Sequence, residues 1–115
     1  MRDPLKDKGR LQHMLEMART LSDERFKHSI EDILQDRILF YGLSKMVEII
    51  GEAAYKITKE YKDSTSEIPW RSIEGMRHIL VHGYFTIRPE ILWDVINNDI
   101  PGLIPHLEKC ISSME

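Results

Sequence analysis

The chain has 115 residues, of which 42% are hydrophobic and 30% charged, which is typical of one soluble globular domain with its own core. The formal net charge of −3 argues against a broad cationic surface for nucleic acid, so any contact with RNA or DNA must be local. The single cysteine, Cys110, excludes an internal disulfide framework and a cysteine-rich zinc site. The sequence shows no apolar signal segment and no membrane span, so we expect a cytoplasmic protein.

The first half of the chain predicts two helices. Asp3 and Pro4 are typical of a helix start, and apolar residues spaced by three and four indicate a helix over residues 4–21. Ser22 and Asp23 then predict a new cap. A long second helix is predicted over residues 29–61, which contain no proline and carry two rows of apolar residues. The rows are Leu39, Leu43, Met46, Ile50, Ala53 and Ile57, and Phe40, Val47, Ala54 and Tyr61.

Two apolar rows indicate that the long helix is covered on two sides. The cover is either the rest of the same domain or a second copy of the chain. Gly51, Ala53 and Ala54 are small, so they would let another helix approach closely at this point.

The second half of the chain predicts three further helices after a polar loop at residues 62–67. Pro69 opens a helix that reaches about Gly83, Pro89 opens one over residues 89–97, and Asp99 caps a last helix that reaches about Ser112. No stretch alternates with period two for long enough to form a strand. We therefore expect an all-α, up-and-down bundle of four to six helices, with residues 1–115 forming one domain.

Side chains that could bind a phosphate or transfer protons are concentrated in residues 75–85. On a helical wheel, the core arc contains Ile73, Met76, Ile79, Leu80 and Gly83. Arg77, His78 and His82 lie on the opposite side, with Tyr84 beside Arg77. Arginine matches phosphate oxygens and histidine transfers protons near neutral pH. A metal-independent ribonuclease needs both groups, and a symmetric dimer would supply each of them twice.

Other interpretations of these residues are open. An arginine and a histidine on a helix face can simply be solvated. His78 and His82 have metal-ligand spacing, but there is no glutamate after the first histidine and no evident third ligand, so we predict no metal and no cofactor. Glu48 and Glu52 favour a solvated or interface patch over a catalytic pair. Glu52 could still contact Arg77 if the two helices pack together.

Several blocks of the sequence resemble one known family. Arg77, four intervening residues, His82, one more residue and Tyr84 match the Arg-x4-His-x-Tyr pattern of the HEPN superfamily. Residues 49–54, 68–70, 80–85 and 91–101 are similar, in the same order, to its HepT-like branch. The resemblance covers nearly the whole chain.

The resemblance implies a homodimeric helical bundle whose arginine and histidine line a cleft between subunits. Many such proteins are metal-independent endoribonuclease toxins, paired with a minimal nucleotidyltransferase (MNT) antitoxin that transfers AMP onto the tyrosine of the pattern. By this analogy Arg77 and His82 are catalytic, Tyr84 is the AMPylation site and RNA is the substrate. His78 stands where the family commonly has Asn or Asp, so its role is open. The alternative is a non-catalytic nucleotide- or partner-binding subunit of a nucleotidyltransferase complex.

Overall fold

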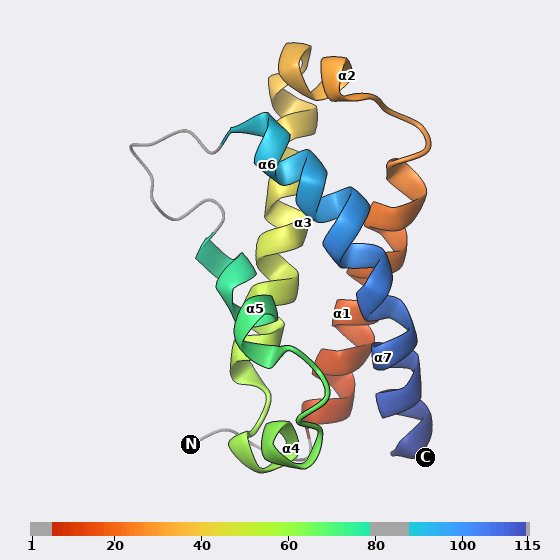
Figure 1. Cartoon of the computed structure of the whole chain (residues 1–115), viewed down its shortest axis with the longest axis vertical. Helices are drawn as coiled ribbons and strands as arrows, with labels where there is room; N and C mark the ends of the chain where they lie inside the picture. Colours follow the sequence, from red (N-terminus) through yellow and green to blue (C-terminus); the bar gives the residue numbers. More distant parts are fainter. Residues whose placement is uncertain (1–5, 79–87, 115) are drawn as a thin grey trace.

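The computed structural model describes residues 6–78 and 88–114, where the regular secondary structure is entirely helical. The predicted all-α bundle is confirmed. Three long helices, α1 (Asp7–Glu24), α3 (Arg37–Lys56) and α7 (Ile100–Ser113), run along the long axis of the molecule (Figure 1). α1 packs against both α3 and α7. No helix in the described part of the chain is long and apolar enough to cross a membrane.

The shorter helices cover the ends and one side of these three. α2 lies at one end of the molecule and α4 at the other, while α5 lies alongside α3 (Figure 1). A 3₁₀ turn follows α5, and a π-helical segment joins α6 to α7. The bounds are α2 (Ile30–Gln35), α4 (Lys59–Ser64), α5 (Trp70–Gly75), η2 (Met76–His78), α6 (Pro89–Asp94) and η3 (Val95–Asp99).

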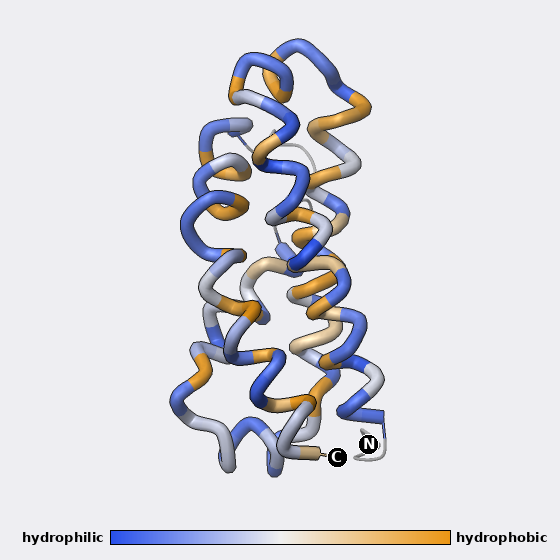
Figure 2. Tube along the Cα trace, turned by 90° about the vertical axis from the view of Figure 1, so that its right-hand side faces the viewer, coloured by the Kyte–Doolittle hydropathy of each residue, from blue (hydrophilic) through white to orange (hydrophobic). Residues whose placement is uncertain are grey.

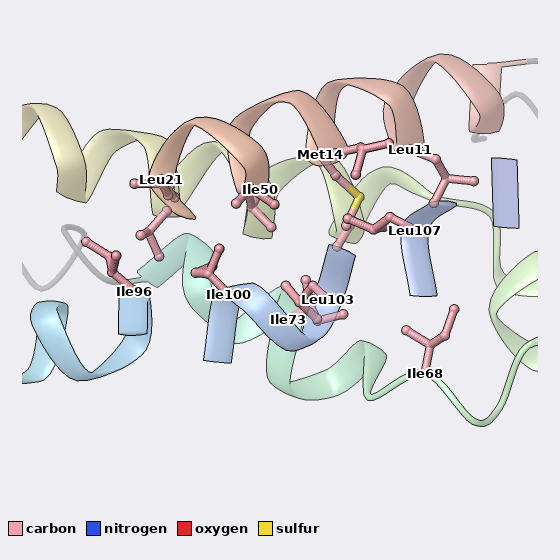
Figure 3. Packing of buried hydrophobic residues seen from close by; sticks show 14 of the residues in the cluster. Leu11, Met14, Leu21, Ile50, Ile68, Ile73, Ile96, Ile100, Leu103 and Leu107 are labelled. Carbon is pink, nitrogen blue, oxygen red and sulfur yellow. The ribbon is translucent and has the colours of Figure 1, made fainter. Parts of the chain in front are cut away.

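The core forms where the apolar stripes of the helices meet. Polar and apolar segments alternate along the helices (Figure 2), as expected for amphipathic elements. Met14 of α1, Ile50 of α3 and Ile73 of α5 point toward one another and toward Leu107 of α7 (Figure 3), and all four are at most 1% exposed. Burying each such side chain contributes about 1.5–3 kcal/mol, so the core fixes how α3 and α5 pack.

The prediction of a single long helix over residues 29–61 is wrong, because the chain forms α2, α3 and α4 there. Asp36 is extended and its Oδ1 accepts a hydrogen bond from the N–H of Leu39 (3.1 Å), which begins α3. Thr58 is also extended and its Oγ1 accepts from the N–H of Tyr61 (3.3 Å), which begins α4. Asp and Thr side chains compete with the helical ladder for backbone N–H groups, and here they end one helix and start the next.

Other predicted boundaries also shift. α1 continues through Ser22 to Glu24, so the cap predicted at Ser22 and Asp23 is wrong, and α4 takes up the first half of the polar loop predicted at residues 62–67. Pro89 begins α6 as predicted. The π-helical segment η3 replaces the break predicted before the last helix. The predicted start at Pro4 and the predicted helix beyond His78 lie outside the described residues.

A buried side chain joins the start of α1 to the junction between α3 and α4. Asp7 is 4% exposed, and its two carboxylate oxygens accept hydrogen bonds from Thr58. Oδ1 accepts from the N–H of Thr58 (3.1 Å), and Oδ2 accepts from the Oγ1 hydroxyl of Thr58 (2.7 Å). Buried polar groups are costly unless they are hydrogen-bonded, and this pair satisfies both partners. The contact therefore fixes the first turn of α1 against the end of α3.

Candidate active site

Arg77 lies in the 3₁₀ turn η2, whose backbone packs directly on α3. Gly51 of α3 is buried at this contact. A Cβ atom on Gly51 would lie 2.7 Å from the carbonyl carbon of Met76 and 2.9 Å from the Cα of Arg77, closer than real side chains come to backbone. The expectation that Gly51 permits a close approach is confirmed, and the neighbour is a turn of the same chain.

The guanidinium group of Arg77 is held on an aromatic ring. Its Cζ lies 3.9 Å from the ring centroid of Tyr55 on α3, within the range of a cation–π interaction. Its Nη1 lies 3.9 Å from Oε1 of Glu74 and donates to the carbonyl oxygen of Glu74 at 3.5 Å. Nε and Nη2 make no such contact within the described residues. Arg77 can therefore offer these N–H groups to an anion while its position is fixed.

Glu74 is shared between two cations. Its other oxygen, Oε2, lies 3.0 Å from Nζ of Lys62, which also donates to the carbonyl oxygen of Tyr55 at 3.3 Å. We call Tyr55, Lys62, Glu74 and Arg77 the Arg77 cluster. Its side chains come from α3, α4, α5 and η2, and it holds two cations against one carboxylate. The cluster is thus locally cationic in a chain of net charge −3.

The Arg77 cluster is only partly shielded from solvent. The side chains of Arg77 and Glu74 are 26% and 24% exposed, and that of Lys62 is 13% exposed. Electrostatic interactions are stronger at such half-buried positions than between fully solvated charges. The cluster therefore combines a fixed cation with an accessible surface, as a phosphate site requires.

Comparisons with known proteins identify the family. Residues 11–110 match the family model described as ribonuclease HepT-like. The chain belongs to this family. It is 37% identical over 101 residues to "Putative RNase TTE0752" of Caldanaerobacter subterraneus subsp. tengcongensis, covering 88% of this chain and 90% of that protein. It is 39% identical over 88 residues to "Probable ribonuclease HepT" of Thermococcus cleftensis, covering 75% of this chain and 80% of that protein. No solved structure matches the chain significantly.

The structure describes three of the five site residues predicted for this HepT-like chain. His78 follows Arg77 in η2 and is exposed. Glu52 does not contact Arg77: its Oε1 lies 4.0 Å from Nζ of Lys56 on the same helix. Gly51 and Tyr55 occupy the face of α3 toward η2, and Glu52 lies about 100° around the helix from Gly51. His82 and Tyr84 lie outside the described residues.

The sequence analysis missed the residues that hold Arg77. Tyr55 follows Gly51 by one helical turn, so a glycine at a close contact and an aromatic residue four positions later were an available signal. Lys62 and Glu74 gave no such signal, because their contact depends on how α4 and α5 pack in this HepT-like fold. Groups of three or more His, Cys, Asp or Glu side chains that could hold a metal ion are absent from residues 6–78 and 88–114.

Proposed function

We propose that this chain is a metal-independent endoribonuclease in which Arg77 binds the reacting phosphate and His82 transfers protons. The observation that carries the proposal is the Arg77 cluster, which fixes a half-buried guanidinium on the ring of Tyr55 with donors left for an anion. Membership of the ribonuclease HepT-like family and the names of the two relatives support the same activity.

In the proposed reaction, the 2′-hydroxyl of a ribose attacks the adjacent phosphorus. The 2′-oxygen forms a bond to phosphorus as it loses its proton, and the bond from phosphorus to the 5′-oxygen breaks. The leaving 5′-oxygen takes up a proton, and a 2′,3′-cyclic phosphate remains. Arg77 stabilises the negative charge of the phosphorane, and a histidine imidazole serves as base or acid.

We propose that the active form is a homodimer, in which base and acid come from the His82 side chains of both subunits. Four large apolar side chains on neighbouring elements are exposed and support a surface for a second copy. Leu34 lies on α2, Ile38 and Tyr41 lie on α3, and Ile91 lies on α6; α2 packs against both α3 and α6.

The metal-free mechanism predicts that RNA is cleaved in the presence of excess chelator. Mass spectrometry of the products should show 2′,3′-cyclic phosphate ends, because the 2′-oxygen is the nucleophile. The His82→Ala protein, purified in parallel, is the control for contaminating nuclease. Cleavage that stops when chelator is added would contradict the mechanism. RNA or nucleotide binding without cleavage would instead favour the non-catalytic subunit.

We further propose that this chain is the toxin of a HEPN/MNT pair, and that the MNT antitoxin modifies Tyr84. The Tyr84 oxygen would attack the α-phosphorus of ATP, lose its proton and release pyrophosphate. The resulting AMP ester would place a bulky anion near Arg77 and compete with the RNA phosphate by charge and by volume.

Co-expression with an MNT antitoxin is therefore expected to add AMP to Tyr84 and to abolish RNA cleavage. Intact-mass measurement detects the adduct. The Tyr84→Phe variant is the control, and it should carry no adduct while keeping its fold. If the unmodified protein is neutralised equally well, inhibition occurs by binding and not by modification.

A further inference from the structure

A second cationic surface lies between the first half of α1 and the last half of α3. The two helices form an open groove with a volume of about 650 Å³. Lys6, Arg10 and His13 line it from the α1 side, and Glu52 and Lys56 line it from the α3 side. Each set is spaced by three or four residues, so each forms a stripe on the face of its helix that borders the groove.

The charge of the groove is opposite to that of the whole chain. Its lining contains three cationic side chains and one carboxylate, in a chain of net charge −3. Glu52 and Lys56 are 4.0 Å apart and about half exposed, a weak pairing that solvent screens. Asp7 lies 3.8 Å from Arg10, and its negative charge offsets part of the Arg10 charge although its oxygens also accept hydrogen bonds from Thr58. Three cations against Glu52 and Asp7 leave an excess of one positive charge at the groove. The groove therefore attracts anions.

The floor of the groove is apolar. Ile49 and Ala53 of α3 contribute hydrocarbon surface, and Gly9 of α1 contributes bare backbone. No atom lies within 4 Å of the position that a Cβ on Gly9 would take, so this part of the groove is open. An apolar floor between cationic edges suits a nucleotide, whose base has a flat face and whose phosphate is charged. The volume is within the range of small-molecule sites, and a base can lie on this floor only when it is unpaired and unstacked.

The groove and the Arg77 cluster share the last turns of α3. Gly51 and Tyr55 contact η2, while Glu52 and Lys56 line the groove. The two sites are thus on adjacent faces of one helix, whose diameter with side chains is about 10 Å. A single strand whose phosphate lies on Arg77 would therefore need to cross only this helix to reach the groove.

We propose that the groove binds the single-stranded RNA segment that flanks the cleaved phosphate. Lys6, Arg10 and Lys56 contact its phosphates, and a base lies on the apolar floor. This inference rests on the proposed function, because it takes RNA as the ligand. It adds a binding site that the Arg-x4-His-x-Tyr pattern does not contain.

The charge of the groove is tested by measuring RNA binding at several salt concentrations, in a His82→Ala background that slows the proposed cleavage. The Lys6→Gln/Lys56→Gln double variant is compared with Lys27→Gln/Lys109→Gln, which removes the same charge outside the groove. The probe is a single-stranded RNA oligonucleotide. The groove variant should bind more weakly, and its slope of log K against log salt should be smaller by about 1.4, since each lost phosphate contact contributes about 0.7. The control should keep the parent slope.

The shape of the groove is tested without a change of charge. Gly9→Leu fills the floor, and Gly102→Leu makes the same change on α7, where a Cβ also meets nothing within 4 Å. We expect only Gly9→Leu to weaken RNA binding, while both proteins keep the parent melting temperature or exceed it.

Equal binding by the groove variants and their controls would overturn the proposal, even if the wild-type protein cleaves RNA. Binding that depends on the groove in a protein that never cleaves would support the proposal and contradict the nuclease. Absence of RNA binding by the parent protein would reject both.

Discussion

Arg77→Ala is expected to lower kcat/KM for RNA cleavage by about 100-fold to 1,000-fold, the usual cost of removing one donor from a developing oxyanion. His82→Ala is expected to lower it by about 100-fold to 10,000-fold, because a positioned general acid or base is lost. Arg77→Lys keeps the charge but loses the planar guanidinium, so its activity should lie between those of wild type and Arg77→Ala. The measurement is kcat/KM on a defined RNA, with melting temperatures for each variant.

Arg71→Ala is the matched control for Arg77→Ala. Arg71 lies on α5, six residues before Arg77, and is exposed. It makes no ion pair or hydrogen bond with its side chain within the described residues. Arg71→Ala should therefore leave cleavage within a factor of about two, since surface substitutions usually change little. Retained activity in Arg77→Ala, or an equal loss in Arg71→Ala, would contradict the assigned role of Arg77.

The fold was largely predictable because the core pattern is local. The two apolar rows of residues 39–61 are buried or packed on the core, as their spacing indicates. The helix breaks inside residues 29–61 were not predicted, because this stretch contains no proline and the row that ends at Tyr61 continues across Thr58. Periodicity reports which side faces the core, whereas Asp36 and Thr58 decide where each helix begins. The hydrogen bonds of these two capping side chains are local, and they interrupt the helix although the stretch contains no proline.

The candidate site was predictable only where it follows a sequence pattern. Arg77 belongs to that pattern and lies against α3, but its partners come from three elements whose approach depends on tertiary packing. Glu52 was expected to contact Arg77, yet a shift of one position from Gly51 turns a side chain by about 100°. The neighbour on the correct face is Tyr55. The residue of α3 that contacts η2 can be identified only from the packed structure, since the sequence does not show which face of α3 lies against η2.

Gly51 supplies the most direct test of how the fold positions Arg77. Gly51→Ala places a Cβ against backbone atoms of Met76 and Arg77, and backbone cannot move aside as a flexible side chain can. We expect the free energy of unfolding to fall by about 1–3 kcal/mol from overpacking, reduced by about 1 kcal/mol because alanine favours the helix. We also expect kcat/KM to fall by up to about 100-fold, since a displacement of about 1 Å can have that effect on catalysis.

Gly42→Ala is the matched control, because Gly42 lies on the same helix and a Cβ there meets no atom within 4 Å. It should raise the free energy of unfolding by up to about 1 kcal/mol and leave cleavage unchanged. Urea unfolding and RNA cleavage of both variants separate the two effects. If Gly51→Ala is as stable and as active as Gly42→Ala, the close contact between α3 and η2 does not position Arg77. If Gly51→Ala loses activity while it remains folded at the assay temperature, the contact acts on the site itself, through the turn that carries Arg77.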